Sequence, residues 1–512
     1  MSTGALDVGK PLTRADVIAV AEGRRDARMP ADVRERVAKS RAYVDELVAA
    51  GEVVYGVTTG FGKFATTSIP PEDVVALQRN LLRSHAVGVG EPLAADLVRA
   101  MLLLRAHSLA HGASGVRPEL IDLLLDVLRA GVVPEVPAKG SVGASGDLAP
   151  LAHMALPLLG EGFARVDGEL MSGAAALERV GLSPLELAAK EGLALINGTQ
   201  YMAAHLVFAL HRAELVADAA DVAAAMSVEG LMGSHKPFDE AVVRLRPHPG
   251  ARLVAERMRA LLRGSRIEPS HADCGRVQDA YSLRAVPQVH GATRDALAHA
   301  AAVVDVELAS VTDNPLVLAD ERAVLSAGNF HGQPLALIAD FAAIAVAELA
   351  SISERRVEQL VNPALSGLPA FLTSRGGLNS GFMVAQYTAA ALVSENKVLS
   401  HPASVDSIPT SANQEDHVSM GAHAARKLLE VVDNTATVVA IESIVAAQAL
   451  DLRLPLRPGA GAAAAHELVR GMVAPLEGDR SLSVDVETLK QAVLDGSLGA
   501  AARAVLGGDG PH

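Results

Sequence analysis

Long apolar stretches separated by short polar or glycine-rich breaks dominate the chain. The clearest stretch begins at Pro334, a favoured first helical position, and contains no glycine or further proline before Asn362-Pro363. At 1.5 Å rise per residue, this predicted helix is about 40 Å long. Further helices are expected from about 294 to 311, ended by Thr312-Asp313-Asn314-Pro315, and from about 415 to 450. Such helices, apolar on more than one face, indicate a bundle.

The first part of the chain shows a different pattern. Thr13 is a suitable N-cap for one short helix, and Pro30 opens a second. The segment 55–62, YGVTTGFG, is too rich in glycine and threonine for a helix and is expected to form tight turns. A helical stretch through 77–82 then leads to a second glycine-punctuated loop at 85–90. Loops of this kind on a rigid scaffold often carry function.

A change of texture near residue 110 suggests two parts, an N-terminal domain over 1–110 with loops and a helical bundle over 111–512. Half of the residues are apolar, only 3% are aromatic, and tryptophan is absent. This alanine-, valine- and leucine-rich composition favours a mostly α fold. The tail beyond residue 455 contains no motif that indicates a function.

The formal net charge of −14 and the lack of a basic run exclude an electrostatic surface for nucleic acid or an anionic membrane. A small soluble substrate is expected instead. The single cysteine, Cys274, cannot form an internal disulfide, and the N-terminus lacks an apolar secretion segment, which together predict a cytoplasmic protein. The charge-free segment Gly192–His211 contains several polar residues and is interpreted as buried interior.

The segment 140–150, GSVGASGDLAP, contains the candidate chemistry. An isolated Ala-Ser-Gly tripeptide is most often a simple turn. A hydrolase nucleophile elbow requires Gly-x-Ser-x-Gly, and Asp147 occupies the fifth position, so that pattern fails. Another interpretation is cyclisation, in which the unhindered amide nitrogen of Gly146 attacks the carbonyl carbon of Ala144. Loss of two waters, one from the Ser145 hydroxyl, leaves a methylidene-imidazolone, an electrophile that ordinary side chains cannot supply.

The same segment is similar to the prosthetic-group signature of the aromatic amino-acid ammonia-lyases. Six other segments resemble motifs of that family in the same order: YGVTTGFG at 55–62, RSHAVGVG at 83–90, EGLALINGTQ at 191–200, RVQDAYSLR at 276–284, GNFHGQP at 328–334 and SANQEDHVSMG at 411–421. Together they cover roughly residues 50 to 450. The resemblance implies a group formed from Ala144, Ser145 and Gly146, with no dissociable cofactor.

Two positions distinguish substrates within the family. The loop contains Ser84-His85, as in histidine-specific members, and Gln414 is followed by Glu415, which other members usually lack. An imidazole both donates and accepts hydrogen bonds, so a histidine and a carboxylate are suitable ligands for it. The resemblance therefore implies that L-histidine is converted to trans-urocanate and ammonia, in histidine degradation.

The resemblance also assigns roles to other residues. It implies that Tyr55 is the base and that Tyr281 and Asn197 orient the amine and support the electrophile. Arg284 is expected to bind the substrate carboxylate through a bidentate pair. Gln278 and Phe330 are expected in the pocket. Family members are homotetramers or larger assemblies whose active sites combine three subunits, which fits the surplus of apolar helix surface.

Several alternatives stay open or fail. Within the family, an ammonia-lyase or aminomutase acting on tyrosine or phenylalanine is the closest rival, and an inactive helical scaffold is the rival from another class. A metal site at His271, Asp273 and Cys274 lacks the further ligands that zinc requires. The segment 60–63 lacks the glycine spacing of a phosphate loop. Ala152 and Ala285 stand where relatives often carry serine and cysteine, and neither carries an assigned role.

Overall fold

The computed structural model describes residues 4–60, 62, 69–275 and 277–505, and these residues form a mostly α fold, as predicted. The contacts divide the chain into two compact units. Unit 1 comprises 1–208, 301–340 and 402–426, and unit 2 comprises 209–300, 341–401 and 427–512. Residue 110, where the change of texture suggests a boundary, lies inside unit 1, and that division stays a prediction.

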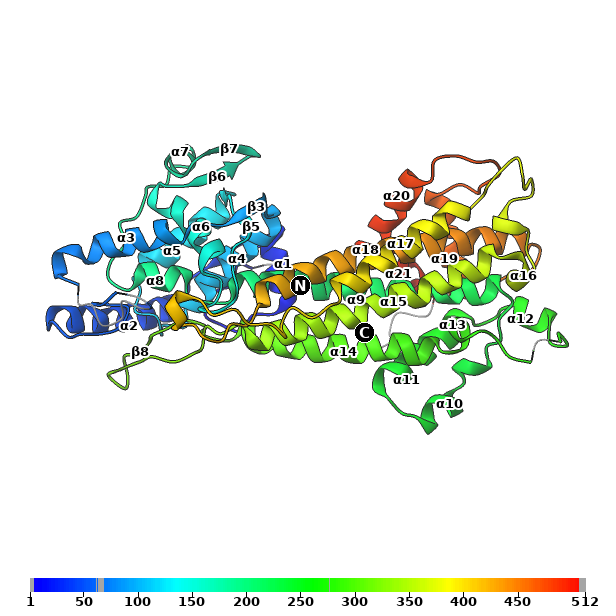
Figure 1. The fold of residues 1–512 in the computed structure, drawn as a ribbon, viewed down its shortest axis with the longest axis horizontal. Helices are drawn as coiled ribbons and strands as arrows, with labels where there is room; N and C mark the ends of the chain where they lie inside the picture. The colour runs from blue at the N-terminus through cyan, green and yellow to red at the C-terminus, as the bar shows by residue number, and fades with distance from the viewer. Residues whose placement is uncertain (1–3, 61, 63–68, 276, 506–512) are drawn as a thin grey trace. The chain divides into compact units, whose positions relative to one another are not determined.

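Unit 1 combines helices with short strands (Figure 1). The strands pair as a parallel β1-β2 ribbon, antiparallel β3-β5 and β8-β9 pairs and a three-stranded β4-β6-β7 sheet. Its helices are α1 (Arg14–Ala21), α2 (Ala31–Ala49), α3 (Val74–His85), α4 (Ala95–Leu109), α5 (Pro118–Arg129), α6 (Leu148–Ala155), α7 (Gly173–Arg179) and α8 (Glu191–Ile196). Its strands are β1 (Leu6–Asp7), β2 (Ala27–Arg28), β3 (Val89–Pro92), β4 (Val133–Pro134), β5 (Pro137–Lys139), β6 (Phe163–Val166), β7 (Glu169–Ser172), β8 (Leu316–Leu318) and β9 (Ala323–Leu325).

Unit 2 consists of helices and loops, with no β-strand among its described residues (Figure 1). Four long helices divide their residues between the two units: α9 (Gln200–Gly230), α14 (Val286–Leu308), α15 (Gln333–Val361) and α18 (Gly421–Leu452). The other helices of unit 2 are α10 (Glu240–Leu245), α11 (Pro249–Leu261), α12 (Ile267–Ser270), α13 (Tyr281–Arg284), α16 (Pro363–Ser366), α17 (Met383–Leu399), α19 (Ala460–Met472), α20 (Ser483–Leu494) and α21 (Ser497–Val505).

Local sequence rules explain several helix boundaries. Thr13 caps α1 in a reciprocal capping box with Asp16, and α2 begins directly after Pro30, as predicted. The helix expected from Pro334 is α15, which begins one residue earlier. Two predicted starts were wrong: α14 begins at Val286 instead of 294, and α18 begins at Gly421 instead of 415.

The apolar helices α15 and α18 are long enough to cross a membrane by length and composition alone. In their most apolar windows, 61% of α15 and 83% of α18 is buried inside the protein. This degree of burial is typical of core helices. The charge-free segment Gly192–His211 is also mostly buried, which confirms the prediction that it lies in the protein interior.

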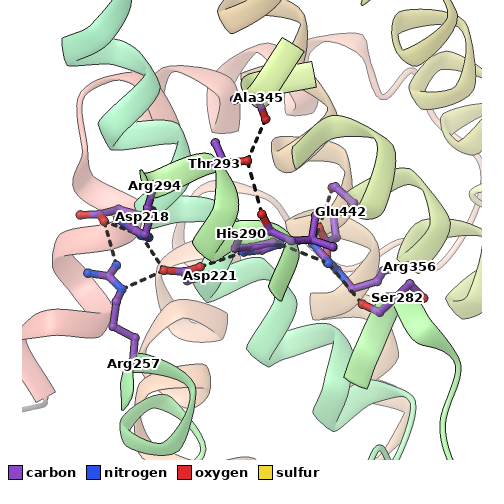
Figure 2. Close-up of polar contacts among 12 residues, drawn as sticks. Asp218, Asp221, Arg257, Ser282, His290, Thr293, Arg294, Ala345, Arg356 and Glu442 are labelled. Carbon is purple, nitrogen blue, oxygen red and sulfur yellow. Dashed lines mark hydrogen bonds and ion pairs between the residues drawn. The ribbon is translucent and has the colours of Figure 1, made fainter. Parts of the chain in front are cut away.

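A buried polar network crosses the helices of unit 2 (Figure 2). Arg356 of α15 binds both carboxylate oxygens of Glu442 of α18, and both side chains are fully buried. On α14, His290 shares a 2.8 Å hydrogen bond between its Nδ1 and Asp221 of α9, and its Nε2 lies 3.4 Å from Arg356. The network explains why α14 extends back through His290 and Gly291, which the sequence pattern left outside the helix.

We expect Arg356→Met to lower the free energy of unfolding by about 3–5 kcal/mol, because the buried Glu442 loses its buried ion-pair partner. Urea unfolding at neutral pH measures this change. Arg179 provides the control, since its side chain is 43% exposed and pairs with Glu169, which is 67% exposed. Arg179→Met is expected to cost less than about 1 kcal/mol. Equal losses in the two variants would contradict a special role for the buried pair.

Two buried histidines of unit 1 predict a loss of stability in mild acid. Burial lowers the pKa of both His107 and His205 from 6.5 to about 4. Below pH 6.5 the unfolded chain therefore binds two protons that the folded chain excludes, so stability falls as the pH decreases from 6.5 toward 4. Between about pH 7.5 and 5.5 the two groups together remove about 3 kcal/mol.

Urea unfolding midpoints at these two pH values measure the effect. In His107→Asn, the amide oxygen accepts the Gly9 backbone N–H that now binds His107 Nδ1, and the new side chain does not titrate. This variant should retain only half of the pH-dependent loss attributed to the two histidines. An unchanged pH dependence in His107→Asn would exclude His107 as a source.

Candidate active site

A cavity of about 840 Å³ in unit 1 brings together most of the predicted site residues. Its lining comes from several separate segments of the sequence, including the loop after α2, the end of α3 and the turn before α18. The predicted residues in the lining are Tyr55, His85, Ala144, Ser145, Asn197, Phe330 and Glu415. Gly146 follows Ser145 directly.

The Ala144-Ser145-Gly146 segment precedes α6 and adopts a tight turn. Gly146 has a φ of +71°, which a residue with a side chain adopts only under strain. Gly146 also forms an isolated parallel bridge with Gly198, and a Cβ at position 146 would lie 2.1 Å from the Gly198 carbonyl oxygen. The backbone N–H of Asp147 donates to the same oxygen at 2.7 Å. Only glycine fits at position 146.

Two side chains bind the central residue of this turn. The amide Nδ2 of Asn197 donates to the Ser145 carbonyl oxygen at 2.8 Å, and the Ser145 hydroxyl donates to Glu415 Oε1 at 2.7 Å. The Asn197 side-chain oxygen is buried and has no hydrogen-bond partner among the described residues. A buried acceptor without a partner indicates a place for a donor such as a substrate amine.

Beneath this turn, Asp147 is fully buried and accepts hydrogen bonds from the Ser141 hydroxyl and the Met202 backbone N–H. Burial raises the pKa of Asp147 to about 7 despite these two donors. Asp147 therefore ties the turn to α9 through Met202 and to its own loop through Ser141.

Tyr55 lies in a loop that is anchored by its neighbours. Val57 is fully buried in a cluster with Tyr43, Val44 and Leu47 of α2. Thr58 and Thr59 bond to the surrounding backbone. The Gly62 N–H points to the Tyr55 hydroxyl oxygen at 3.5 Å. The described part of the YGVTTGFG motif is therefore an irregular loop as predicted, while Phe61 lies outside the described residues.

His85 is the last residue of α3 rather than part of a loop, and Val89 and Gly90 belong to the short strand β3, so the predicted 85–90 loop was too long. Burial lowers the pKa of His85, and the Glu415 charge acts in the opposite direction. Its ring nitrogen Nδ1 lies 3.0 Å from the Ser84 hydroxyl. A neutral imidazole in the cavity lining can both donate to and accept from a polar ligand.

Glu415 lies in a strained turn rather than at a helix start. Ser411, Ala412 and Asn413 all have positive φ angles between 51° and 71°. Thr410 and Glu415 pair through two backbone hydrogen bonds, and the Thr410 hydroxyl donates to Glu415 Oε2. Backbone strain of this kind persists where the surroundings hold it, and here it directs the carboxylate to Ser145.

Two further histidines, His331 and His417, line the cavity and were not predicted as site residues. Their rings stack at a centroid distance of 5.9 Å, and His331 Nε2 lies 3.1 Å from the His417 carbonyl oxygen. Both lie inside quoted motifs, next to Phe330 in one and two residues after Glu415 in the other. This closeness in sequence to predicted site residues is the signal that could have identified both histidines as cavity residues.

Gln278, Tyr281 and Arg284 belong to unit 2 and do not line this cavity. Tyr281 is 75% exposed, and its ring centroid lies 4.5 Å from the guanidinium of Arg284. Gln278 lines a separate cavity of about 350 Å³ beside Cys274 and His271. Arg276, the first residue of this motif, lies outside the described residues. The described residues contain no cluster of three metal-binding side chains.

Comparison with known proteins decides the family. The sequence model of the aromatic amino acid lyase family matches residues 12–471 of this chain. The chain belongs to the aromatic amino acid lyase family. Histidine ammonia-lyase of Sorangium cellulosum is 57% identical over 98% of this chain and 99% of its own length.

Solved structures of the aromatic amino acid lyase fold agree with this assignment. Histidine ammonia-lyase from Trypanosoma cruzi superposes with a TM-score of 0.91 at 44% identity, over 98% of this chain and 95% of that one. Tyrosine aminomutase from Streptomyces globisporus superposes with a TM-score of 0.92 at 39% identity, over 98% of both chains. One lyase fold therefore serves different aromatic substrates, so side chains in the cavity must select among them.

Proposed function

We propose that this protein is a histidine ammonia-lyase that converts L-histidine to trans-urocanate and ammonia, the first step of histidine degradation. One observation carries the proposal: Ser145, the central residue of a turn that only glycine can complete, bonds to Glu415 in a cavity that His85 also lines. The 57% identity to a histidine ammonia-lyase over nearly the full length supports it.

The geometry of the turn fits a 4-methylidene-imidazol-5-one formed from Ala144, Ser145 and Gly146. Gly146 has an unhindered amide, and its φ of +71° places it in a tight turn that glycine adopts readily. Asn197 already binds the Ser145 carbonyl oxygen, which becomes the ring oxygen. Such a group supplies a strong electrophile within the polypeptide, and no dissociable cofactor is needed.

The residues of the cavity divide the remaining work. His85 and Glu415 bind the substrate imidazole. The Glu415 carboxylate accepts a hydrogen bond, and a His85 ring nitrogen donates or accepts one according to whether it carries a proton. Tyr55, which lines the same cavity as Ser145, removes the weakly acidic β-hydrogen as the general base. Asn197 orients the amine through its unpartnered side-chain oxygen. Phe330 contributes an apolar wall.

The other predicted substrate-binding residues, Gln278, Tyr281 and Arg284, complete the active site when subunits assemble. In a homotetramer with shared active sites, the exposed Tyr281 and the half-buried Arg284 of one subunit enter the cavity of another, with Gln278 beside them. Arg284 then binds the substrate carboxylate and Tyr281 acts at the amine. We place the assembled enzyme in the cytoplasm, with L-histidine as its small-molecule partner and without nucleic acid or membrane.

The decisive experiment combines intact mass with product formation from separate amino acids. The purified protein should weigh two waters less than its sequence and release a conjugated acrylate from histidine, but not from tyrosine or phenylalanine. Product from phenylalanine or tyrosine instead would favour the rival lyase or aminomutase specificity. A full mass with no turnover would favour an inactive scaffold. The absence of tryptophan makes the added near-ultraviolet absorbance a clear second readout.

A further inference from the structure

Arg105 is a fully buried cation directly behind the reactive turn. It lies on α4 and is 0% exposed, among the largest side chains with no accessible surface. Its Nη1 donates to the Asn197 carbonyl oxygen at 2.9 Å and to Gln200 Oε1 at 3.0 Å. Burial lowers the pKa of Arg105 to about 10, so the guanidinium stays charged at neutral pH.

Gly198 lies between Arg105 and the turn. A Cβ on Gly198 would be 2.4 Å from Arg105 Nη1, so the guanidinium packs directly against this glycine. A Cβ on Gly146 would meet the Gly198 carbonyl oxygen at 2.1 Å and its carbonyl carbon at 2.5 Å. The Asn197–Gly198 peptide thus touches the guanidinium through Gly198 and the reactive segment through Gly146, and Asn197 additionally binds Ser145.

Stability alone does not explain this arginine. The Nε and Nη2 atoms of Arg105 are buried without a hydrogen-bond partner among the described residues. A buried cation with unpaired donors destabilises a fold relative to an apolar side chain of similar size. The carboxylate of Asp313 attracts the charge of Arg105 but is already bonded to the buried Lys190, so the three groups keep a net positive charge.

We propose that Arg105 is a positioning residue for formation of the prosthetic group, holding the Asn197–Gly198 peptide against the Ala144-Ser145-Gly146 segment so that Gly146 stays within reach of Ala144. This inference rests on the proposed function. In the step, the Gly146 nitrogen bonds to the Ala144 carbonyl carbon, and the Ala144 oxygen leaves as water with the amide hydrogens of Gly146 and Ser145. The Ser145 hydroxyl leaves as a second water with the Cα hydrogen, and no oxidant is required.

The test follows intact mass over time after cell-free synthesis, in the soluble fraction of the full chain. Wild type should reach the two-water deficit, while Arg105→Met should do so at least about tenfold more slowly, because small misplacements strongly slow intramolecular reactions. Arg105→Lys keeps the positive charge but not the planar guanidinium, so its rate of maturation should lie between those of wild type and Arg105→Met. Near-ultraviolet absorbance per folded chain gives the same ranking independently of activity.

Arg356→Met is the matched control, since it removes another fully buried arginine from the separate network of unit 2 (Figure 2). Its soluble fraction should mature at the wild-type rate. Wild-type maturation in Arg105→Met, or equal slowing in Arg356→Met, overturns the proposal. If Arg105→Met is insoluble, Arg105→Lys decides, and a wild-type rate there overturns it as well. Absence of the deficit in wild type instead contradicts the proposed function itself.

Discussion

Ser145→Ala should lower the turnover of histidine by at least about a thousandfold, because alanine has no hydroxyl to leave and cannot form the exocyclic electrophilic carbon. The intact mass should show a deficit of at most one water, and the added near-ultraviolet absorbance should be absent. The side chain is small and lines an open cavity, so loss of the hydroxyl bond to Glu415 should leave the fold intact.

Ser326 provides the control for this variant, because it lines the same cavity and has no assigned role. Ser326→Ala should keep the full two-water deficit and a turnover within about tenfold of wild type. Turnover of Ser145→Ala at near the wild-type rate would contradict the electrophile and with it the proposed mechanism. Mass and turnover must be measured on the same sample, since incomplete maturation alone also lowers the rate.

Tyr55→Phe should lower kcat by about a hundredfold to ten-thousandfold, the range expected when a general base is removed, with a much smaller change in KM. The ring stays in place because Val57 and the threonines of the loop anchor the backbone independently of the hydroxyl. The two-water deficit should remain complete, since the Tyr55 hydroxyl bonds to Gly62 and not to the reactive turn.

Tyr201→Phe is the matched control, because the buried Tyr201 hydroxyl donates to the Ala138 carbonyl oxygen at 2.8 Å and serves packing. Loss of this bond should cost about 1 kcal/mol of stability and change kcat by only a few fold. A similar fall of kcat in the two variants, or an unchanged kcat in Tyr55→Phe, would remove Tyr55 from the role of base.

The proposed selection for histidine rests on short-range contacts in one cavity. His85, Glu415 and the stacked pair of His331 and His417 give the cavity polar groups on several sides. A phenyl ring can form no hydrogen bond with His85 or Glu415, whereas an imidazole can both donate and accept. The tyrosine aminomutase with the same fold shows that the scaffold itself does not select the substrate.

Features governed by near neighbours in the chain could be predicted from the sequence. The Thr13 capping box, the start of α2 after Pro30 and the long helix α15 depend on the few residues around each boundary, so composition and spacing suffice. The motifs likewise identified the family and the reactive tripeptide, because their residue types and order are properties of the chain itself.

Only the tertiary structure decided what depends on groups distant in sequence. The start of α14 is extended by a buried network with Asp221 and Arg356, and Glu415 leaves the helix because a bridge to Thr410 holds a strained turn. Arg105 reaches Gly198 from a helix more than ninety positions earlier. Burial and desolvation set these contacts, and neither has a local signature in the order of amino acids.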